Sequence, residues 1–140
     1  MISRLFIAWA LVALCVMIHA AGVSAALRRL PLETPGARRF GRSTWIFIEI
    51  AGWMILFHLL EITAWATVYY LDQALPDLSS SMYFSAVTYT TTGYGDVVLP
   101  PDWRLVGGIE ALTGILMCGW STGFFFAAVS RMYQARSSAM

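Results

Sequence analysis

The sequence has little charge and no lysine. Only 12% of its 140 residues are charged, and all nine basic residues are arginines. Soluble globular proteins carry charge on about a quarter of their residues, so a soluble globular domain is excluded. The formal net charge of +1 leaves no surplus of positive charge to attract a polyanion. Nucleic acid is therefore excluded as a partner.

Cysteine is equally scarce. The two cysteines, Cys15 and Cys118, both lie in apolar runs rather than in loops. A disulfide framework is therefore not expected, and each cysteine is expected to pack as a small apolar side chain. The chain also lacks internal repeats and low-complexity tracts, so each of its motifs occurs once per chain.

Apolar residues, by contrast, are abundant, because 59% of the chain is hydrophobic and its mean hydropathy is +0.67. Three long apolar runs each reach the roughly 20 residues that a helix needs to cross a bilayer. They predict an all-α membrane protein with transmembrane helices over residues 1–27, 44–70 and 103–131. Residues 28–43, rich in arginine, proline and glycine, are expected to form a cytoplasmic linker, and residues 132–140 a short cytoplasmic tail.

The arginines predict how the chain is oriented in the membrane. Arginine clusters between the first two apolar runs and follows the third, at Arg131 and Arg136, and such residues stay on the cytoplasmic side. The N-terminus is therefore expected outside and the C-terminus inside, in a prokaryotic plasma (inner) membrane. The first run also contains Val23-Ser24-Ala25, an acceptable signal-peptidase site, but its length and the arginines after it favour a retained helix.

The most informative stretch is Thr90-Thr91-Thr92-Gly93-Tyr94-Gly95-Asp96. Two glycines flank a tyrosine, so the backbone can alternate between conformations that side chains normally forbid. That alternation points successive carbonyl oxygens toward one axis, and Thr91 adds a hydroxyl at the inner end of the row. Four such loops around an axis would form stacked oxygen rings that replace the water shell of a dehydrated monovalent cation.

The flanking residues support this interpretation. Residues 79–90 are expected to form a short helix with a serine-rich N-terminal cap, whose negative dipole end faces the ion path. Asp72 and Asp77 before it are expected in an exposed outer loop that concentrates cations. Downstream, Pro100-Pro101-Asp102-Trp103 interrupts the chain and starts the last apolar helix.

These residues resemble the selectivity filter of the potassium channel family, whose pattern Thr-Val-Gly-Tyr-Gly-Asp is matched from Thr91 to Asp96 with one change. The resemblance covers residues 45–131 and implies an outer helix, a re-entrant pore helix, a filter and an inner helix, assembled as a homotetramer. The first transmembrane helix is an addition to that pattern. The filter residues implied to surround K⁺ are Thr91, Thr92, Gly93, Tyr94 and Gly95, with carbonyls from the first four, the Tyr94 side chain packed against the pore helices, and Asp96 supporting the filter from behind.

The resemblance also implies roles in the last helix. Gly114 falls where the family carries a hinge glycine, although a simple packing contact explains a glycine there equally well. Ile115, Cys118 and Thr122 are implied to line the cavity below the filter. Thr92 departs from the usual valine, and its hydroxyl is expected to loosen ion choice.

Two further departures concern gating. Val87 stands where some members have a glutamate that braces the filter, so inactivation is expected to differ. Neither an arginine-repeat voltage sensor nor a nucleotide- or calcium-sensing domain is recognised in the sequence, which leaves the gating stimulus open.

Ionisable residues inside apolar runs suggest function or specific pairing. His58 and Glu61 share one helical face. They offer either a hydrogen-bonded lock between helices, which we favour, or part of a metal site that needs further ligands. Glu110 is expected to hydrogen-bond behind the pore helix rather than face the ions. His19 is expected to be a packed or interfacial histidine, and Glu49 to pair with the arginines of the linker.

The predicted function is passive, potassium-selective conduction, with no enzyme activity and no cofactor besides the permeant K⁺. Its expected partners are three further copies of the chain and the lipid bilayer, and a regulatory subunit is left open. Three alternatives remain: a weakly selective cation channel, a channel subunit that needs a partner chain, and a membrane metal-binding protein built on His58 and Glu61.

Overall fold

The computed structural model describes residues 2–29 and 39–137, which form four α-helices and one short 3-10 turn. The helices are α1 (Ile2–Arg29), α2 (Arg39–Leu71), α3 (Leu78–Tyr89) and α4 (Arg104–Ser137), and the turn η1 (Pro101–Trp103) leads directly into α4. These two ranges contain no strand. The predicted all-α fold is therefore confirmed.

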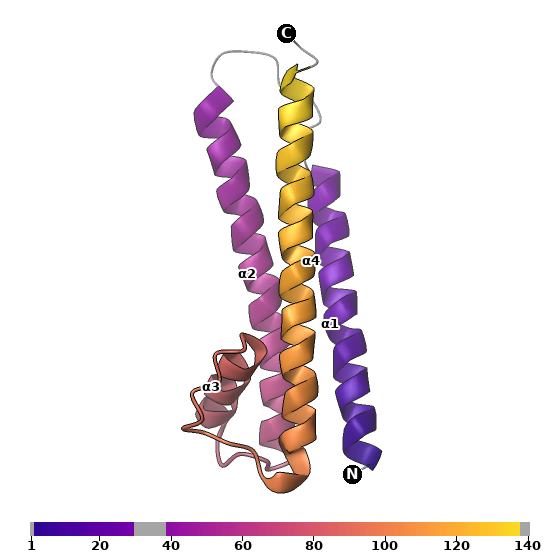
Figure 1. Ribbon diagram of the computed structural model, residues 1–140, viewed down its shortest axis with the longest axis vertical. Coiled ribbons are helices and arrows are strands. Elements are labelled where there is room, and N and C mark those ends of the chain that lie inside the picture. Colours follow the sequence, from indigo (N-terminus) through magenta and orange to yellow (C-terminus); the bar gives the residue numbers. More distant parts are fainter. Residues whose placement is uncertain (1, 30–38, 138–140) are drawn as a thin grey trace.

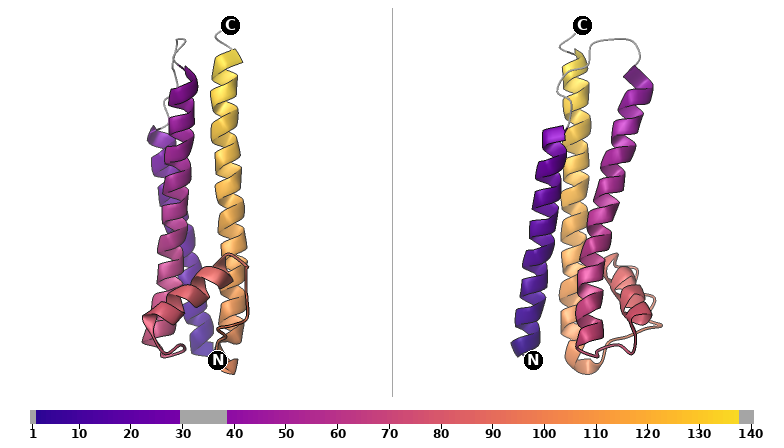
Figure 2. Two further views of the ribbon diagram at one scale, coloured as in Figure 1. Left: turned by 90° about the vertical axis from the view of Figure 1, so that its left-hand side faces the viewer. Right: turned by 180° about the vertical axis from the view of Figure 1, so that it is seen from behind.

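Three long helices, α1, α2 and α4, form an elongated bundle, and the short α3 lies against α2 and α4 near one end of it (Figures 1 and 2). The N-terminus of α1 lies at the end that holds α3, and the C-terminus of α4 lies at the other end (Figure 1). Ile2–Ala26, Thr44–Leu71 and Pro101–Ser130 are long and apolar enough to cross a membrane. The chain is thus a multi-pass membrane protein with the three predicted spans.

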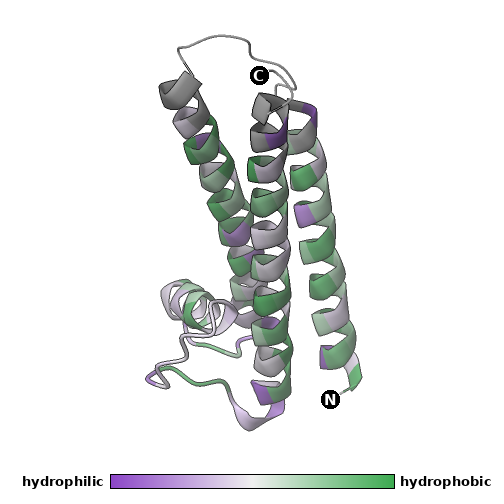
Figure 3. Cartoon of the chain, turned by 45° about the horizontal axis from the view of Figure 1, so that its top comes forward, coloured by the Kyte–Doolittle hydropathy of each residue, from purple (hydrophilic) through white to green (hydrophobic). Residues whose placement is uncertain are grey.

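Hydrophobic residues recur along the three long helices (Figure 3). Phe6 and Trp9 on α1, Ile55 on α2, and Leu112 and Phe126 on α4 are all exposed in the single chain. Soluble monomers rarely expose contiguous apolar surface on this scale. Lipid tails or neighbouring chains therefore cover these faces.

Several element boundaries differ from the prediction. Helix α2 begins at Arg39, inside the segment expected to be a linker over residues 28–43, and α1 runs to Arg29. Pro31 and Pro35, which break helices, precede α2, and residues 30–38 lie outside the described part. Helix α4 continues to Ser137, through most of the expected tail. No glycine or proline interrupts the chain between residues 131 and 137.

The cap of α3 also differs from the prediction. Asp77, expected to be an exposed acidic residue of the outer loop, is exposed and is also the N-cap of α3. It accepts hydrogen bonds from the Ser80 amide (2.8 Å) and hydroxyl (2.9 Å). The Ser80 amide holds the pKa of Asp77 below its usual range. Aspartate caps as well as serine does, so the first residue able to satisfy the free amides became the cap.

An aromatic core closes the end of the bundle that holds α3. The Tyr69 ring makes edge-on contacts with Phe84 on α3 (5.4 Å between centroids) and with Trp103 in η1 (5.8 Å). Arg4 on α1 lies over the Trp103 ring at 5.1 Å and pairs with Asp102 at 3.0 Å. These contacts join α1, α2, α3 and the start of α4, and they hold both ends of the segment between α3 and α4.

Candidate pore loop and the buried polar residues behind it

The loop that follows α3 has a backbone that alternates in handedness. The φ angle is +60° at Thr91, +50° at Gly93 and +81° at Gly95, whereas Thr92 and Tyr94 between them keep negative φ. Such alternation turns successive peptide planes so that their carbonyls can share one side of the strand. The alternation predicted from the glycine spacing is therefore present, and it extends to Thr91, which is not a glycine.

Hydrogen bonds hold this loop against the last turn of α3. The Thr91 amide donates to the Thr88 carbonyl (2.9 Å), and the Gly93 amide donates to the Val87 carbonyl (3.0 Å). The hydroxyls of Thr90 and Thr92 lie 3.0 Å apart. The Thr92 hydroxyl thus has a partner within its own loop, and Thr90, to which the sequence analysis gave no role, supplies it.

The same loop is open on its outer side. Residues 90–96 are all exposed in the single chain, and the Tyr94 side chain is 73% exposed. A Cβ built on Gly93 or Gly95 would meet nothing within 4 Å. The packing of Tyr94 against pore helices, which the family resemblance implies, requires other chains and stays a prediction.

Asp96 ends the loop with a hydrogen bond to α3. The Tyr83 hydroxyl donates to the Asp96 carboxylate at 2.7 Å, and this bond lowers the pKa of Asp96 and raises that of Tyr83. The bond joins the far end of the loop to the helix that precedes it. The supporting role of Asp96 behind a filter stays a prediction.

Gly114 on α4 lies directly against the end of α3. A Cβ on Gly114 would overlap the carbonyl oxygen of Tyr89 and lie 2.7 Å from its carbonyl carbon. A glycine at this position was explained either by a hinge or by a packing contact, and the packing contact is present. A hinge at Gly114 stays a prediction, because it concerns movement.

The three residues expected to line a cavity, Ile115, Cys118 and Thr122, are all exposed in the single chain. The Thr122 hydroxyl donates to the Cys118 carbonyl at 2.9 Å, within α4. Cys15, by contrast, is fully buried, and both cysteines are free thiols. The two cysteines are thus not joined by a disulfide, as expected. The cavity-lining role of Ile115, Cys118 and Thr122 needs several chains and stays a prediction.

Comparison with protein families gives a match to a family model described as ion channel, over residues 57–131. The match includes the end of α2, the whole of α3, the loop over residues 90–96 (the candidate pore loop) and α4 to Arg131. It covers just over half of the chain. The chain belongs to this ion channel family. The family is one of channels rather than of enzymes, as the sequence predicted.

A relative of this channel chain is the potassium voltage-gated channel protein shk-1 of Caenorhabditis elegans. The two are 31% identical over an alignment of 88 positions, and the alignment covers 58% of this chain. The chain spans only 16% of the length of that relative. No solved structure matches the chain significantly. The ion channel family model and the similarity to a potassium channel together confirm the predicted resemblance to the potassium channel family.

Behind α3, the helix expected to be the pore helix, lies a buried carboxylate, Glu110 on α4. It accepts a hydrogen bond from the Tyr69 hydroxyl at 2.7 Å and another from the Ser85 hydroxyl on α3. Ser85 also lies 2.9 Å from the Ile62 carbonyl on α2. The prediction that Glu110 hydrogen-bonds behind the pore helix is confirmed, and Tyr69 and Ser85 are the partners that it did not name.

Replacing Glu110 by alanine is expected to destabilise the channel chain. The Tyr69 hydroxyl would be left buried without an acceptor, which costs about 2 kcal/mol. Thermal unfolding of the purified protein in detergent would measure the loss. Glu49→Ala is the matched control, because Glu49 is exposed, and equal stability of the two variants would contradict the prediction.

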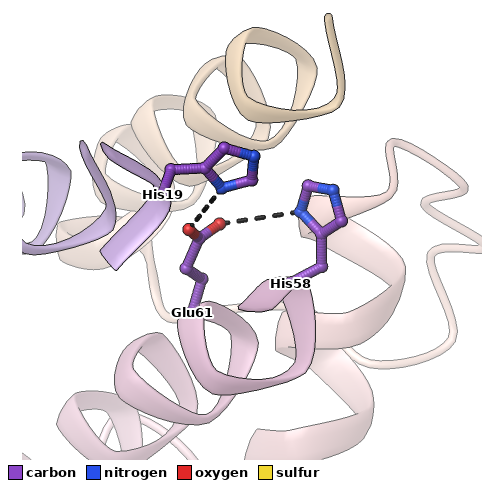
Figure 4. A group of neighbouring side chains, drawn as sticks. All are labelled: His19, His58 and Glu61. Carbon is purple, nitrogen blue, oxygen red and sulfur yellow. Dashed lines mark hydrogen bonds and ion pairs between the residues drawn. The ribbon is translucent and has the colours of Figure 1, made fainter. Parts of the chain in front are cut away.

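A second buried polar cluster joins all four helices. The carboxylate of Glu61 accepts from the Tyr89 hydroxyl, and it lies 2.9 Å from His19 Nδ1 and 3.6 Å from His58 Nδ1 (Figure 4). The Nε2 atoms of His19 and His58 lie 2.7 Å and 3.0 Å from the Ser121 hydroxyl. His58 Nδ1 also lies 3.1 Å from the Tyr89 hydroxyl. His19 and Glu61 are fully buried.

This cluster confirms part of the prediction and enlarges it. His58 and Glu61 do form a hydrogen-bonded connection between helices, as favoured from their spacing. The contact of His19 on α1 with the same carboxylate was not predicted from the sequence. The available signal was a histidine in the middle of one apolar run and a His-x-x-Glu pair in the next. The predicted pairing of Glu49 with the linker arginines involves side chains outside the described part.

Proposed function

We propose that four copies of this chain form a potassium-selective channel in the plasma (inner) membrane. Dehydrated K⁺ would be coordinated by the carbonyl oxygens of Thr91, Thr92, Gly93 and Tyr94 and by the Thr91 hydroxyl. Gly95 would form the outer exit, and Asp96 would support the filter through its bond to Tyr83. The channel needs no cofactor beyond the permeant ion.

The observation that carries this proposal is the alternation of positive and negative φ from Thr91 to Gly95. A non-glycine residue at φ = +60° costs free energy, so this conformation requires a stabilising reason. A cation bound in front of the row of carbonyls would supply that stabilisation. The hydrogen bonds of the loop to α3 leave its other side exposed.

The exposure of the loop supports a homotetramer. One chain supplies one column of oxygens, whereas a dehydrated ion needs ligands on all sides, and identical chains usually assemble with closed rotational symmetry. The exposed Tyr94 ring would be covered in that assembly. A further regulatory subunit is compatible with this arrangement.

The direction in which α3 points supports the same function. Its last residue, Tyr89, contacts His58 on α2 and lies against Gly114 on α4, so the C-terminus of α3 points into the bundle, away from the end of the molecule. The partial negative charge of a helix C-terminus stabilises a nearby cation. Arginines near the opposite end of the bundle, such as Arg28 on α1, support a cytoplasmic position for that end by the positive-inside rule. The N-terminus and the filter entrance would then face outward.

The test is the reversal potential of the purified chain in liposomes with potassium on one side and sodium on the other. We expect a value near the potassium equilibrium potential. A reversal potential near zero with clear current would instead establish a weakly selective cation channel. Thr92→Val then decides whether Thr92 is responsible, because valine removes the hydroxyl beside Thr90 and restores the residue usual in the family.

Absence of current needs a separate readout. Crosslinking of the protein in liposomes, followed by gel electrophoresis, shows whether four chains assemble. A silent tetramer would indicate a closed gate, whereas a silent monomer would contradict the homotetramer and favour a subunit that needs a partner chain.

A further inference from the structure

We propose that His19, His58 and Glu61 form a binding site for a transition-metal dication, with Zn²⁺ as the preferred ion. The three side chains come from α1 and α2, and one ligand atom of each lies within 4.8 Å of the other two. Both Nδ1 atoms face the Glu61 carboxylate, at 2.9 Å and 3.6 Å (Figure 4). This site is separate from the proposed path of K⁺, and the proposal does not depend on conduction.

The donor types select the metal. Two imidazole nitrogens and one carboxylate oxygen are a set that Zn²⁺ takes when a fourth position is left to another ligand. Calcium and magnesium prefer oxygen donors throughout and are disfavoured here. Tetrahedral zinc with these donors spaces its ligand atoms about 3.3 Å apart. The two nitrogen–oxygen distances, 2.9 Å and 3.6 Å, run to different oxygens of the Glu61 carboxylate, and the three ligand atoms lie within 4.8 Å of one another. The side chains would therefore move closer together to bind one ion.

The far sides of the two rings are arranged as metal-bound histidines require. A histidine that binds metal through one nitrogen donates its other N–H to a fixed acceptor. Here the Nε2 atoms of His19 and His58 converge on one hydroxyl, that of Ser121 on α4, at 2.7 Å and 3.0 Å. The two lone pairs of Ser121 Oγ can accept from both rings at once. Both Nδ1 atoms are then free of protons and face Glu61.

A count of protons also favours a cation between these groups. The cluster has five close polar contacts: Glu61 with His19 and with Tyr89, Ser121 with each histidine, and His58 with Tyr89. Each contact needs one proton. With Glu61 ionised and both histidines neutral, the two rings, Ser121 and Tyr89 supply one proton each, so one contact lacks a proton. A metal ion at the Nδ1 atoms removes that conflict, and an extra proton is the rival solution.

Tyr89 is placed to complete the site. Its hydroxyl lies against the Glu61 carboxylate and 3.1 Å from His58 Nδ1, so it can fill the fourth position. Tyr89 is the last residue of α3 and immediately precedes the pore loop. A bound metal would thus hold α1 to α2 and touch the base of the loop.

The test is the metal content of the full-length chain, purified in detergent with any affinity tag removed. After exposure to zinc sulfate and gel filtration, elemental mass spectrometry is expected to find one zinc per chain. The sequence contains only two histidines, so His19→Ala and His58→Ala test every nitrogen donor of this kind. Both variants and Glu61→Gln are expected to lose the zinc, whereas Glu110→Gln, which changes the other buried carboxylate, is expected to keep it.

Two further measurements test the site even if a ligand variant fails to fold. Cobalt(II) replaces zinc and absorbs visible light strongly only in a tetrahedral site, so the unaltered chain titrated with cobalt chloride should develop that absorption. Ser121→Ala keeps all three ligands and is expected to weaken zinc binding by 10- to 100-fold. Less than one zinc per four chains together with no tetrahedral cobalt absorption would overturn the proposal and favour the extra proton. Zinc retained by folded His19→Ala and Glu61→Gln would overturn it as well.

Discussion

Gly93→Ala is expected to abolish potassium flux through the channel. Gly93 has a φ of +50°, and a Cβ there would meet nothing within 4 Å, so the effect comes from the backbone and not from crowding. Alanine in this conformation costs about 1–2 kcal/mol per chain. Four chains would bear that cost at the same ring of carbonyls. The loop would lower this cost by rotating the peptide, so that its carbonyl would leave the ring.

The measurement is potassium efflux from liposomes that contain the purified variant, compared with the unaltered chain at equal protein content. Gly52→Ala is the matched control, because Gly52 lies in the helix α2 and its added Cβ also has open space. The control should conduct normally. A Gly93→Ala variant with unchanged efflux and selectivity would refute the filter assignment.

Gly114→Ala is expected to cause the largest loss of stability among the glycine variants of α4. The added Cβ would overlap the carbonyl oxygen of Tyr89, which is backbone and cannot rotate away. Helix α4 would have to move from the end of α3. Overpacking of this kind costs about 3 kcal/mol, and the movement would also displace the pore loop.

Thermal unfolding in detergent and potassium efflux together test this prediction. Gly108→Ala and Gly119→Ala serve as controls on the same helix, since their Cβ atoms would meet nothing within 4 Å. Because alanine favours helix more than glycine does, both controls should be as stable as the unaltered chain or slightly more so. If Gly114→Ala matched them in stability, the close contact between α3 and α4 would be wrong.

The difference between these two glycines shows what sequence reasoning can reach. The need for glycine at Gly93 follows from its neighbours in the loop, because a row of carbonyls on one side demands an alternating backbone whatever surrounds it. The need for glycine at Gly114 follows from the distance between two helices. Its spacing along α4 fits a hinge and a packing contact equally well, and the position of α3 decides that a contact exists.

The amino-acid sequence by itself determined the three membrane spans, the short helix before the loop and the alternating loop, since length, hydropathy and glycine spacing act locally. It did not determine that His19, His58, Glu61, Tyr89 and Ser121 meet. Spacing within one helix shows which side chains share a face, as for His58 and Glu61. Which faces oppose each other, and at what depth, depends on how each helix is rotated and shifted in the bundle, and only packing between helices sets that.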